Sequence, residues 1–381
     1  MENTLREYYH CTTKVVDAVR NRRAQSVLVP QTDRLQLVYD LYEFTHRDPV
    51  KPLVNLIFLH GSGMNRVVWE YYLVKLAHNA GELPWQPLKI VLLDQATHGD
   101  SAVLNEGKLG VDFDWVDGAR DACQIALDEF PLELDGETVH NVVVGHSMGG
   151  FQALCCAVLC LDFFSTVIAI EPVVVAHFMP EDHRQFTVLN SKFFNALWAK
   201  MESSFETDAE YVEFMTQRSF FTKTHPVILQ RLIDFERRMD HRDGTVRTKI
   251  DRRQNSLCYM TLNPCTSWLI ANLKFIHVPV YSIVGGVSHW TPPANQELLT
   301  KEIHNYEKHI VEDGDHLLNL EMPDAVLMEI QKHISKFVST LQDVQVEKLS
   351  DSQRTGRFAE QYRRFCKERI SDFPLSKVAK L

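Results

Sequence analysis

The sequence lacks the residue spacings that mark metal sites and disulfide scaffolds. Its 381 residues include eight cysteines without a C-x-x-C pair and seventeen histidines without an H-E-x-x-H motif. Zinc ribbons and zinc-dependent proteases use those spacings, and small secreted folds space their cysteines regularly. We therefore expect reduced thiols, no bound metal and no cofactor.

An excess of basic residues is also missing. The chain carries 40 Lys and Arg against 50 Asp and Glu, which gives a formal net charge of -10. Proteins that bind nucleic acid need clustered Lys and Arg to neutralise phosphates. The charge balance argues against nucleic acid as the main partner.

No long uncharged apolar run is present. Asp162 interrupts the most apolar stretch, residues 151–170, which we interpret as a buried helix followed by a buried strand. With 45% hydrophobic and 24% charged residues, the composition is that of a soluble globular protein with a sizeable core.

The most informative stretch is VVVGHSMGG, residues 142–150, which joins an apolar strand pattern to the start of a helix. Its G-x-S-x-G motif places Ser147 between Gly145 and Gly149, because so sharp a turn brings backbone too close for a Cβ. Such a turn projects a hydroxyl above the sheet edge, beside the unpaired N–H groups of the new helix. We interpret Ser147 as a nucleophile; the alternative is a chance match in a loop.

Strand and helix patterns alternate from the first apolar run to Pro172. Residues 27–44 read as two strands around a turn, apolar runs follow at 53–60, 88–94 and 165–172, and TVHNVVVGHS, residues 138–147, supplies a further strand before the last of these. Such runs are typical of strands buried on both faces of a parallel sheet. The order predicts an α/β fold with a mostly parallel, doubly wound sheet.

The alternation stops in the next hundred residues, which show helical patterns rich in aromatic side chains. That length is too great for a structureless loop, so we expect a helical cap insertion, whose aromatic residues either pack internally or line a pocket over Ser147. The expected segments are an N-terminal helical extension, the first part of the core, the cap, the second part of the core and a C-terminal helix with a tail: residues 1–26, 27–172, 173–275, 276–345 and 346–381.

A serine hydroxyl needs a positioned base before it can act as a nucleophile. His316 lies in EDGDHLLNLEMP, residues 312–323, directly after the last predicted strand, YEKHIVE at residues 306–312. Loops after the carboxyl ends of parallel strands converge above the sheet, so this histidine can meet Ser147. A surface-loop histidine is the alternative.

Four motifs, HGSGM, DQATHGDS, GHSMGG and GDHLLNLEMP, together resemble the successive landmarks of the α/β-hydrolase superfamily, over about residues 50–345. With the ending Ala379-Lys380-Leu381, the chain looks like the yeast peroxisomal lipase-like hydrolases. The resemblance implies a helical cap inserted after the sixth strand and a serine hydrolase acting on acyl or lipid esters. The final tripeptide is similar to the S-K-L address, which implies a peroxisomal import receptor as partner and the peroxisomal matrix as location.

Within this superfamily the oxyanion hole consists of two backbone N–H groups. The residue after the nucleophile, Met148, supplies one. The loop after His60-Gly61 supplies the other, most simply from Ser62.

The acid departs from the commonest pattern, which places an aspartate shortly after the seventh strand. The seventh strand predicted here is VPVYSIVGG, residues 278–286, and the region at its end reads GGVSHWTPP, without a carboxylate before Glu297. Glu171, directly after the sixth strand, is our candidate acid, although it could simply begin the insertion. Asp313 and Asp315 are the alternative acids, but their closeness to His316 in sequence makes a hydrogen bond to its far nitrogen awkward.

Two other functions stay open at this point. An acyl-CoA thioesterase would need a site for the CoA phosphates, and no basic cluster is obvious near the motif loops. A non-catalytic ligand-binding protein can also keep the hydrolase fold. Epoxide hydrolases and haloalkane dehalogenases are disfavoured because their intermediate needs an aspartate where this chain has Ser147.

Overall fold

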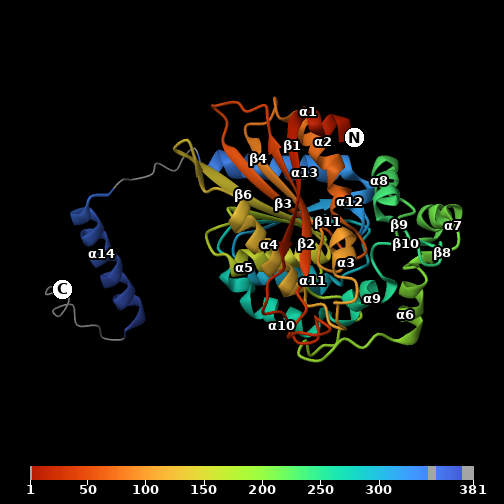
Figure 1. Ribbon diagram of the computed structural model, residues 1–381. Helices are drawn as coiled ribbons and strands as arrows, with labels where there is room; N and C mark the ends of the chain where they lie inside the picture. The colour runs from red at the N-terminus through yellow and green to blue at the C-terminus, as the bar shows by residue number, and fades with distance from the viewer. Residues whose placement is uncertain (1, 342–348, 371–381) are drawn as a thin grey trace. The chain divides into compact units, whose positions relative to one another are not determined.

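The computed structural model describes residues 2–341 and 349–370 (Figure 1). The chain divides into two units, Met1–Val338 and Ser339–Leu381. The second unit contains helix α14 (Asp351–Arg369), which begins with a capping box between Ser350 and Gln353. Ala379, Lys380 and Leu381 lie outside the described residues, so the peroxisomal address stays a prediction.

The first unit is built on one large sheet with the strand order β1-β2-β4-β3-β6-β7-β11-β12, and the short β5 pairs with β6. Strand β2 is antiparallel to both of its neighbours, and the other pairs from β4 to β12 are parallel. In chain order the strands are β1 (Tyr9–Asp17), β2 (Gln36–Phe44), β3 (Leu53–Leu59), β4 (Gln86–Leu93), β5 (Glu133–Leu134), β6 (Glu137–His146), β7 (Thr166–Ile170), β11 (Val280–Gly285) and β12 (Tyr306–Val311). The predicted fold class is confirmed.

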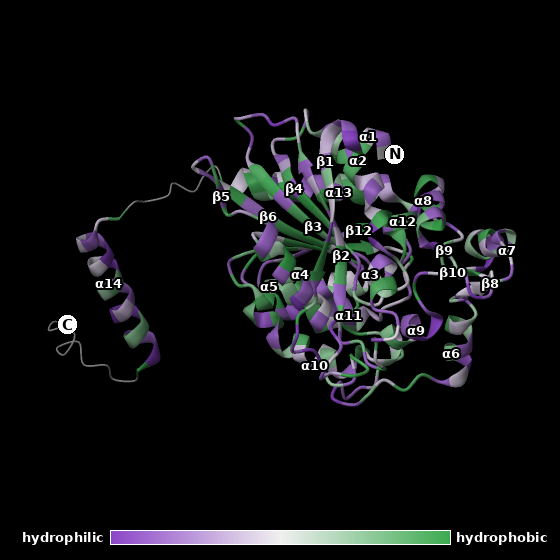
Figure 2. Cartoon of the chain, in the orientation of Figure 1, coloured by the Kyte–Doolittle hydropathy of each residue, from purple (hydrophilic) through white to green (hydrophobic). Residues whose placement is uncertain are grey.

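Helices flank the sheet on both faces (Figure 1). On one face α4 packs on α5, and α5 packs on β6 and β7. Figure 2 shows hydrophobic residues concentrated on the central strands, in agreement with the complete burial of β3 from Val54 onward. Its one polar residue, Asn55, is buried as well and is hydrogen-bonded to Asn141. Apart from the cap and α14, the helices are α1 (Glu2–Tyr8), α2 (Glu70–Asn79), α3 (Gly99–Leu104), α4 (Trp115–Glu129), α5 (Met148–Leu159), α11 (Pro293–Glu302), α12 (Leu318–Glu321) and α13 (Pro323–Leu341), with the short turns η1 (Arg66–Trp69) and η3 (Leu273–Phe275).

The prediction of a helical extension over residues 1–26 is wrong beyond Tyr8. The next nine residues form β1, an edge strand that pairs antiparallel with β2 from Tyr9 opposite Phe44 to Asp17 opposite Gln36. The Thr and Val residues of β1 favour a strand, because branched side chains are crowded in a helix. The expected pair of strands in residues 27–44 reduces to β2, and Val27 forms only an isolated bridge with Leu109.

The cap follows β7, the sixth main-sheet strand along the chain, and it is not wholly helical. Its three-stranded sheet has the order β8-β10-β9, with β8 (Ser204–Phe205), β9 (Arg237–Met239) and β10 (Val246–Thr248). Strands of two or three residues are too short to show alternation in the sequence. The cap helices are α6 (Ser191–Trp198), α7 (Asp208–Glu213), the π-helical turn η2 (Phe214–Arg218), α8 (Pro226–Glu236), α9 (Arg252–Met260) and α10 (Leu262–Asn272).

Candidate active site

Ser147 occupies the turn between β6 and α5. Its backbone angles, φ 55° and ψ -112°, are strained for a residue with a Cβ. The turn is fixed by a 2.9 Å bond from the Ser147 N–H to the Ile170 carbonyl. A Cβ on Gly149 would lie 2.2 Å from the Leu59 carbonyl oxygen, and one on Gly145 would lie 2.0 Å from that of Gly149. Both glycines are therefore required by the close approach of backbone.

His316 lies in the loop between β12 and α12, and its Nε2 is 3.0 Å from Ser147 Oγ. Its backbone is held by His146, whose Nε2 lies 2.8 Å from the His316 carbonyl oxygen. Burial lowers the pKa of His146 well below its ordinary value, so this ring is neutral and donates from Nε2. The neighbouring histidine thus fixes the position of the His316 backbone.

Glu171 follows β7, and its Oε2 lies 3.0 Å from His316 Nδ1. The side chain is 1% exposed. Two further donors reach the carboxylate: the Gly285 N–H at 2.7 Å and the Ser288 hydroxyl at 2.6 Å. A continuous chain of hydrogen bonds therefore runs from the Ser147 hydroxyl through the imidazole to the Glu171 carboxylate.

The two alternative acids take other positions. Asp315 Oδ1 accepts the backbone N–H of His316 at 2.8 Å, and Asp313 is exposed. The far ring nitrogen of His316 meets Glu171 instead. The structure therefore brings Glu171 to the imidazole ring and keeps Asp315 at the backbone.

The loop after β11 contributes two residues whose part in the site the sequence did not reveal. Ser288 donates to Glu171, and Trp290 stacks on the His316 ring with a centroid distance of 5.1 Å and an interplanar angle of 19°. His289, between them, is exposed. The available signal was their place just beyond the carboxyl end of a parallel strand, where functional loops gather.

The loop from residue 61 to 64 lies directly against Ser147, since a Cβ on Gly61 would be 3.3 Å from the Cβ of Ser147. The N–H groups of Ser62 and Met148 have no acceptor among the residues that the structure describes. Gly63 has φ +78°, and its N–H donates to His98 Nε2 at 3.0 Å. Among the described residues the Ser62 N–H is therefore unpaired beside Ser147, whereas the N–H of the next residue, Gly63, is bound to His98.

The other polar residues of this region support loops. His60 Nε2 accepts the Gln95 N–H at 3.1 Å, and burial lowers the pKa of His60 to about 4. The Asp94 carboxylate accepts the Arg66 N–H and the Asp100 N–H, each at 2.8 Å. These hydrogen bonds fix the DQATHGDS loop beside residues 61–64.

A cavity of about 270 Å³ opens over Ser147 and His316. Aromatic side chains of the cap and of the β11 loop form part of its wall, and two lysines also line it: Phe220, Phe221, Tyr259, Trp290, Lys200 and Lys223. Part of the aromatic content of the cap therefore faces the serine, and Tyr211 and Phe214 are examples that pack inside the cap.

A family model described as "Alpha/beta hydrolase family" matches residues 56–329, which is well over half of the chain. The chain belongs to the α/β-hydrolase family. It is 42% identical over 375 residues to "Peroxisomal membrane protein LPX1" of Saccharomyces cerevisiae, covering 94% of this chain and 96% of that protein. A solved structure of peroxisomal alpha-beta-hydrolase Lpx1 from the same organism has 41% identity and a TM-score of 0.81, covering 96% of this chain and 99% of the other.

A more distant relative is named for an enzymatic activity. "Type I acyl-CoA thioesterase mpaH'" of Penicillium brevicompactum is 27% identical over 172 residues, covering 44% of this chain and 38% of that protein.

Within the ranges 2–341 and 349–370, this α/β-hydrolase has no helix both long and apolar enough to cross a membrane.

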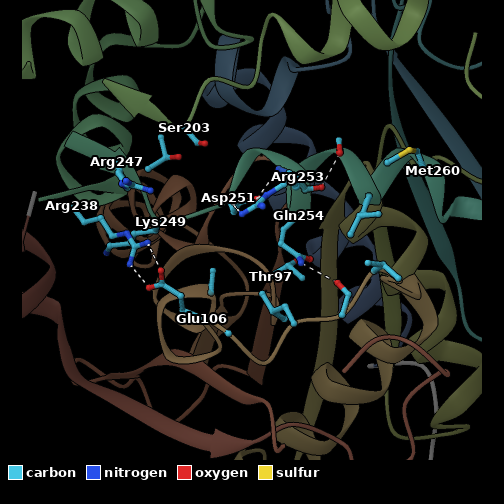
Figure 3. A pocket seen from close by; sticks show the side chains of 18 of the residues that line it. Thr97, Glu106, Ser203, Arg238, Arg247, Lys249, Asp251, Arg253, Gln254 and Met260 are labelled. Carbon is cyan, nitrogen blue, oxygen red and sulfur yellow. Dashed lines mark hydrogen bonds and ion pairs between the residues drawn. The ribbon is translucent and has the colours of Figure 1, made fainter. Parts of the chain in front are cut away.

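This α/β-hydrolase has a second cavity, of about 700 Å³, between the loop that follows β4 and the cap (Figure 3). Five basic residues of the cap line it, a cluster that the sequence did not suggest. Each has a carboxylate partner within 3.0 Å: Arg238 with Glu106, Arg242 with Asp240, Arg247 with Asp243, Lys249 with Asp100 and Arg253 with Asp251. Each of these cations is therefore already paired with a carboxylate, and two of those carboxylates, Glu106 and Asp251, also line the cavity.

Proposed function

We propose that this α/β-hydrolase is a peroxisomal serine hydrolase that cleaves acyl esters through an acyl-enzyme intermediate. The observation that carries the proposal is the chain of hydrogen bonds from Ser147 through His316 to Glu171 beneath the 270 Å³ cavity. Nucleophile, base and orienting carboxylate in such contact are the parts that acyl transfer needs.

In the first half of the reaction, Ser147 Oγ attacks the acyl carbonyl carbon while His316 Nε2 takes the hydroxyl proton. The Glu171 carboxylate accepts the Nδ1–H and stabilises the imidazolium that forms. The Ser62 and Met148 N–H groups donate to the carbonyl oxygen as it becomes an oxyanion. When the tetrahedral intermediate collapses, the bond to the alcohol breaks, and the alcohol leaves with the proton from His316.

In the second half, a water molecule attacks the acyl carbon of the Ser147 ester. His316 accepts a proton from that water, and the same two N–H groups bind the second oxyanion. Collapse then releases the carboxylic acid and returns the proton to Ser147 Oγ.

The cavity supports an apolar acyl group as the part of the substrate that lies against the cap. Phe220, Phe221 and Tyr259 offer apolar contact area close to Ser147, and a few polar groups orient the ester. We therefore propose carboxylic esters with an apolar acyl chain, including lipid esters, as the substrate class.

The peroxisomal location has two supports. The S. cerevisiae relative is named as a peroxisomal protein, and the chain ends in Ala379-Lys380-Leu381. We propose import into the matrix by a receptor that reads the free terminal carboxylate of this tripeptide.

Acyl-CoA thioesters are the second candidate substrate, because the Penicillium relative is named as an acyl-CoA thioesterase. The five cations of the larger cavity would be the phosphate ligands in that case. Each of these cations already has a carboxylate partner that competes with a phosphate for it, which places esters first.

A fluorophosphonate probe tests this proposal on the purified protein. We expect labelling of the wild type and none of Ser147→Ala, followed by turnover in a panel of esters graded by chain length with acyl-CoA included. Absent labelling of the wild type, or equal labelling of Ser147→Ala, would favour a non-catalytic ligand-binding protein.

A further inference from the structure

Glu236, the last residue of α8 in the cap, is a buried carboxylate that the proposed mechanism does not use. It is 3% exposed. Its Oε2 accepts from the side-chain amide of Asn65 at 2.7 Å, and its Oε1 accepts the Ile250 N–H at 2.8 Å. One carboxylate therefore joins two segments of the cap to one residue of the core, 171 positions away in sequence.

Asn65 is the residue that follows the loop of residues 61–64. Its Oδ1 accepts the Val67 N–H, so the same side chain caps η1 while its amide group donates to Glu236. The loop itself is short and closed by a hydrogen bond from the Met64 N–H to the Gly61 carbonyl. A displacement of Asn65 is therefore transmitted to the peptide that presents the Ser62 N–H.

The loop has supports on both sides. From the core, His98 accepts the Gly63 N–H at 3.0 Å. From the cap, Asn255 of α9 packs so closely that a Cβ on Gly63 would lie 3.2 Å from its Nδ2. The cap thus meets this loop region both through the hydrogen bond from Asn65 to Glu236 and through the packing of Asn255 on Gly63.

The cost of burying Glu236 argues that its position matters. In the part of the chain that the structure describes, no lysine, arginine or histidine forms an ion pair with it. The charged groups that face it are Lys249, which favours the ionised form, and Asp94, which opposes it. Burying a carboxyl group without an ion pair costs folding free energy. The presence of Glu236 at this position therefore indicates that its two hydrogen bonds serve a purpose.

We propose that Glu236 is a positioning residue that couples the cap to the loop of residues 61–64, here called the oxyanion loop because it carries the Ser62 N–H. By holding Asn65, it keeps residues 61–64 in the arrangement where the Ser62 N–H faces the reaction centre. The inference rests on the proposed function, because it assigns Ser62 to the oxyanion. It adds a requirement: the cap must be bound to Asn65 through Glu236 for both donors of the oxyanion hole, Ser62 and Met148, to be in place.

Two variants cut the link in different ways. In Glu236→Gln the side chain keeps one acceptor and places an NH₂ group against a donor, so it loses its bond either to Asn65 or to Ile250, and in both cases it holds Asn65 less firmly. In Asn65→Ser the hydroxyl can still cap η1 but cannot reach Glu236. Glu106→Gln is the matched control, because it breaks another cap-to-core contact, the ion pair with Arg238 (Figure 3), away from the oxyanion loop.

We expect Glu236→Gln and Asn65→Ser each to lower kcat by about 10- to 100-fold with little change in KM, less than the loss of a whole oxyanion donor. The double variant should be no slower than the slower single one, since both remove one link. Glu106→Gln should keep the wild-type kcat. A rise in KM with unchanged kcat, or losses that multiply in the double variant, would overturn the coupling.

Hydrogen exchange gives a readout that does not depend on turnover. Backbone amides of residues 62–66 should exchange faster in Glu236→Gln and Asn65→Ser than in the wild type, and at the wild-type rate in Glu106→Gln. Unchanged exchange in both variants would overturn the proposal. If both variants exchanged faster but the fluorophosphonate did not label the wild type, the coupling would stand and the proposed function would be rejected.

Discussion

Glu171 Oε2 lies 3.0 Å from His316 Nδ1, although the two residues are 145 positions apart. Glu171 follows β7, and the neighbouring strand β11 brings Gly285 and Ser288 to the same carboxylate. Two adjacent parallel strands therefore build one acid site at their carboxyl ends: the carboxylate directly follows the earlier strand, and its donors Gly285 and Ser288 lie at the end of the later strand and in the loop after it.

Replacing Glu171 by Gln should lower kcat by about 10³- to 10⁴-fold, because the neutral amide neither fixes the imidazole tautomer nor stabilises the imidazolium. Steady-state kinetics on an activated ester measures the loss. Asp315→Asn and Asp313→Asn are the controls, and both should keep near wild-type kcat. A comparable loss in either control would mean that the acid has been assigned to the wrong carboxylate.

Trp290 should matter through the ring that it covers. Its indole stacks on His316, which carries a positive charge in the transition state of the proposed mechanism, and a cation over an indole gains about 0.5 to 2 kcal/mol. Trp290→Leu should therefore slow acylation by roughly 2- to 30-fold in single-turnover experiments. Trp290→Phe keeps an aromatic face and should lose less; equal rates for the two variants would show that only the volume of the side chain counts.

Gly149 should not tolerate a methyl group. In Gly149→Ala the new Cβ would meet the Leu59 carbonyl oxygen at 2.2 Å, so the turn must shift. We expect a loss of about 1 to 3 kcal/mol in the free energy of unfolding, measured by chemical denaturation. Gly81→Ala, whose Cβ would have nothing within 4 Å, is the control that should leave stability unchanged or improved.

The stability of the protein should depend on pH through Glu236. Burial raises the pKa of this carboxyl from 4.5 to about 7. Below 4.5 it is protonated in both the folded and the unfolded chain and costs nothing; as pH rises towards 7 the unfolded chain ionises first, so folding loses stability, and the cost is complete above 7.

Glu236→Gln cannot ionise, so its free energy of unfolding relative to the wild type should improve between pH 5 and pH 8, by up to about 3 kcal/mol. Denaturation curves of both proteins at the two pH values give the difference. A constant difference across this range would contradict the raised pKa.

The sequence predicted those parts of the fold that local patterns encode. Apolar runs such as residues 53–60 mark strands buried on both faces, and the glycines around Ser147 mark a turn that admits no other residue. His316 could be foreseen because loops at one sheet edge converge. Strand β1 was missed because it lies at the exposed edge of the sheet, where only Tyr9 is buried, and its sequence YHCTTKVVD shows no clear alternation of apolar and polar residues.

Contacts between distant segments were beyond the reach of the sequence. Trp290 over His316, and Asn65 against Glu236, depend on how the β11 loop and the cap pack on the core. The basic cavity was missed for the same reason, since its five cations come from cap residues 238 to 253 and the cavity's opposite wall comes from residues near Glu106. Neither spacing nor composition encodes such packing.

The most direct test of the central claim is to trap the acyl-enzyme and locate its acyl group. After rapid mixing with an activated ester and acid quenching, intact mass should show one acyl group per chain, and peptide mapping should place it on Ser147. An acyl group on another residue, or a burst without any covalent adduct on the wild type, would contradict the mechanism.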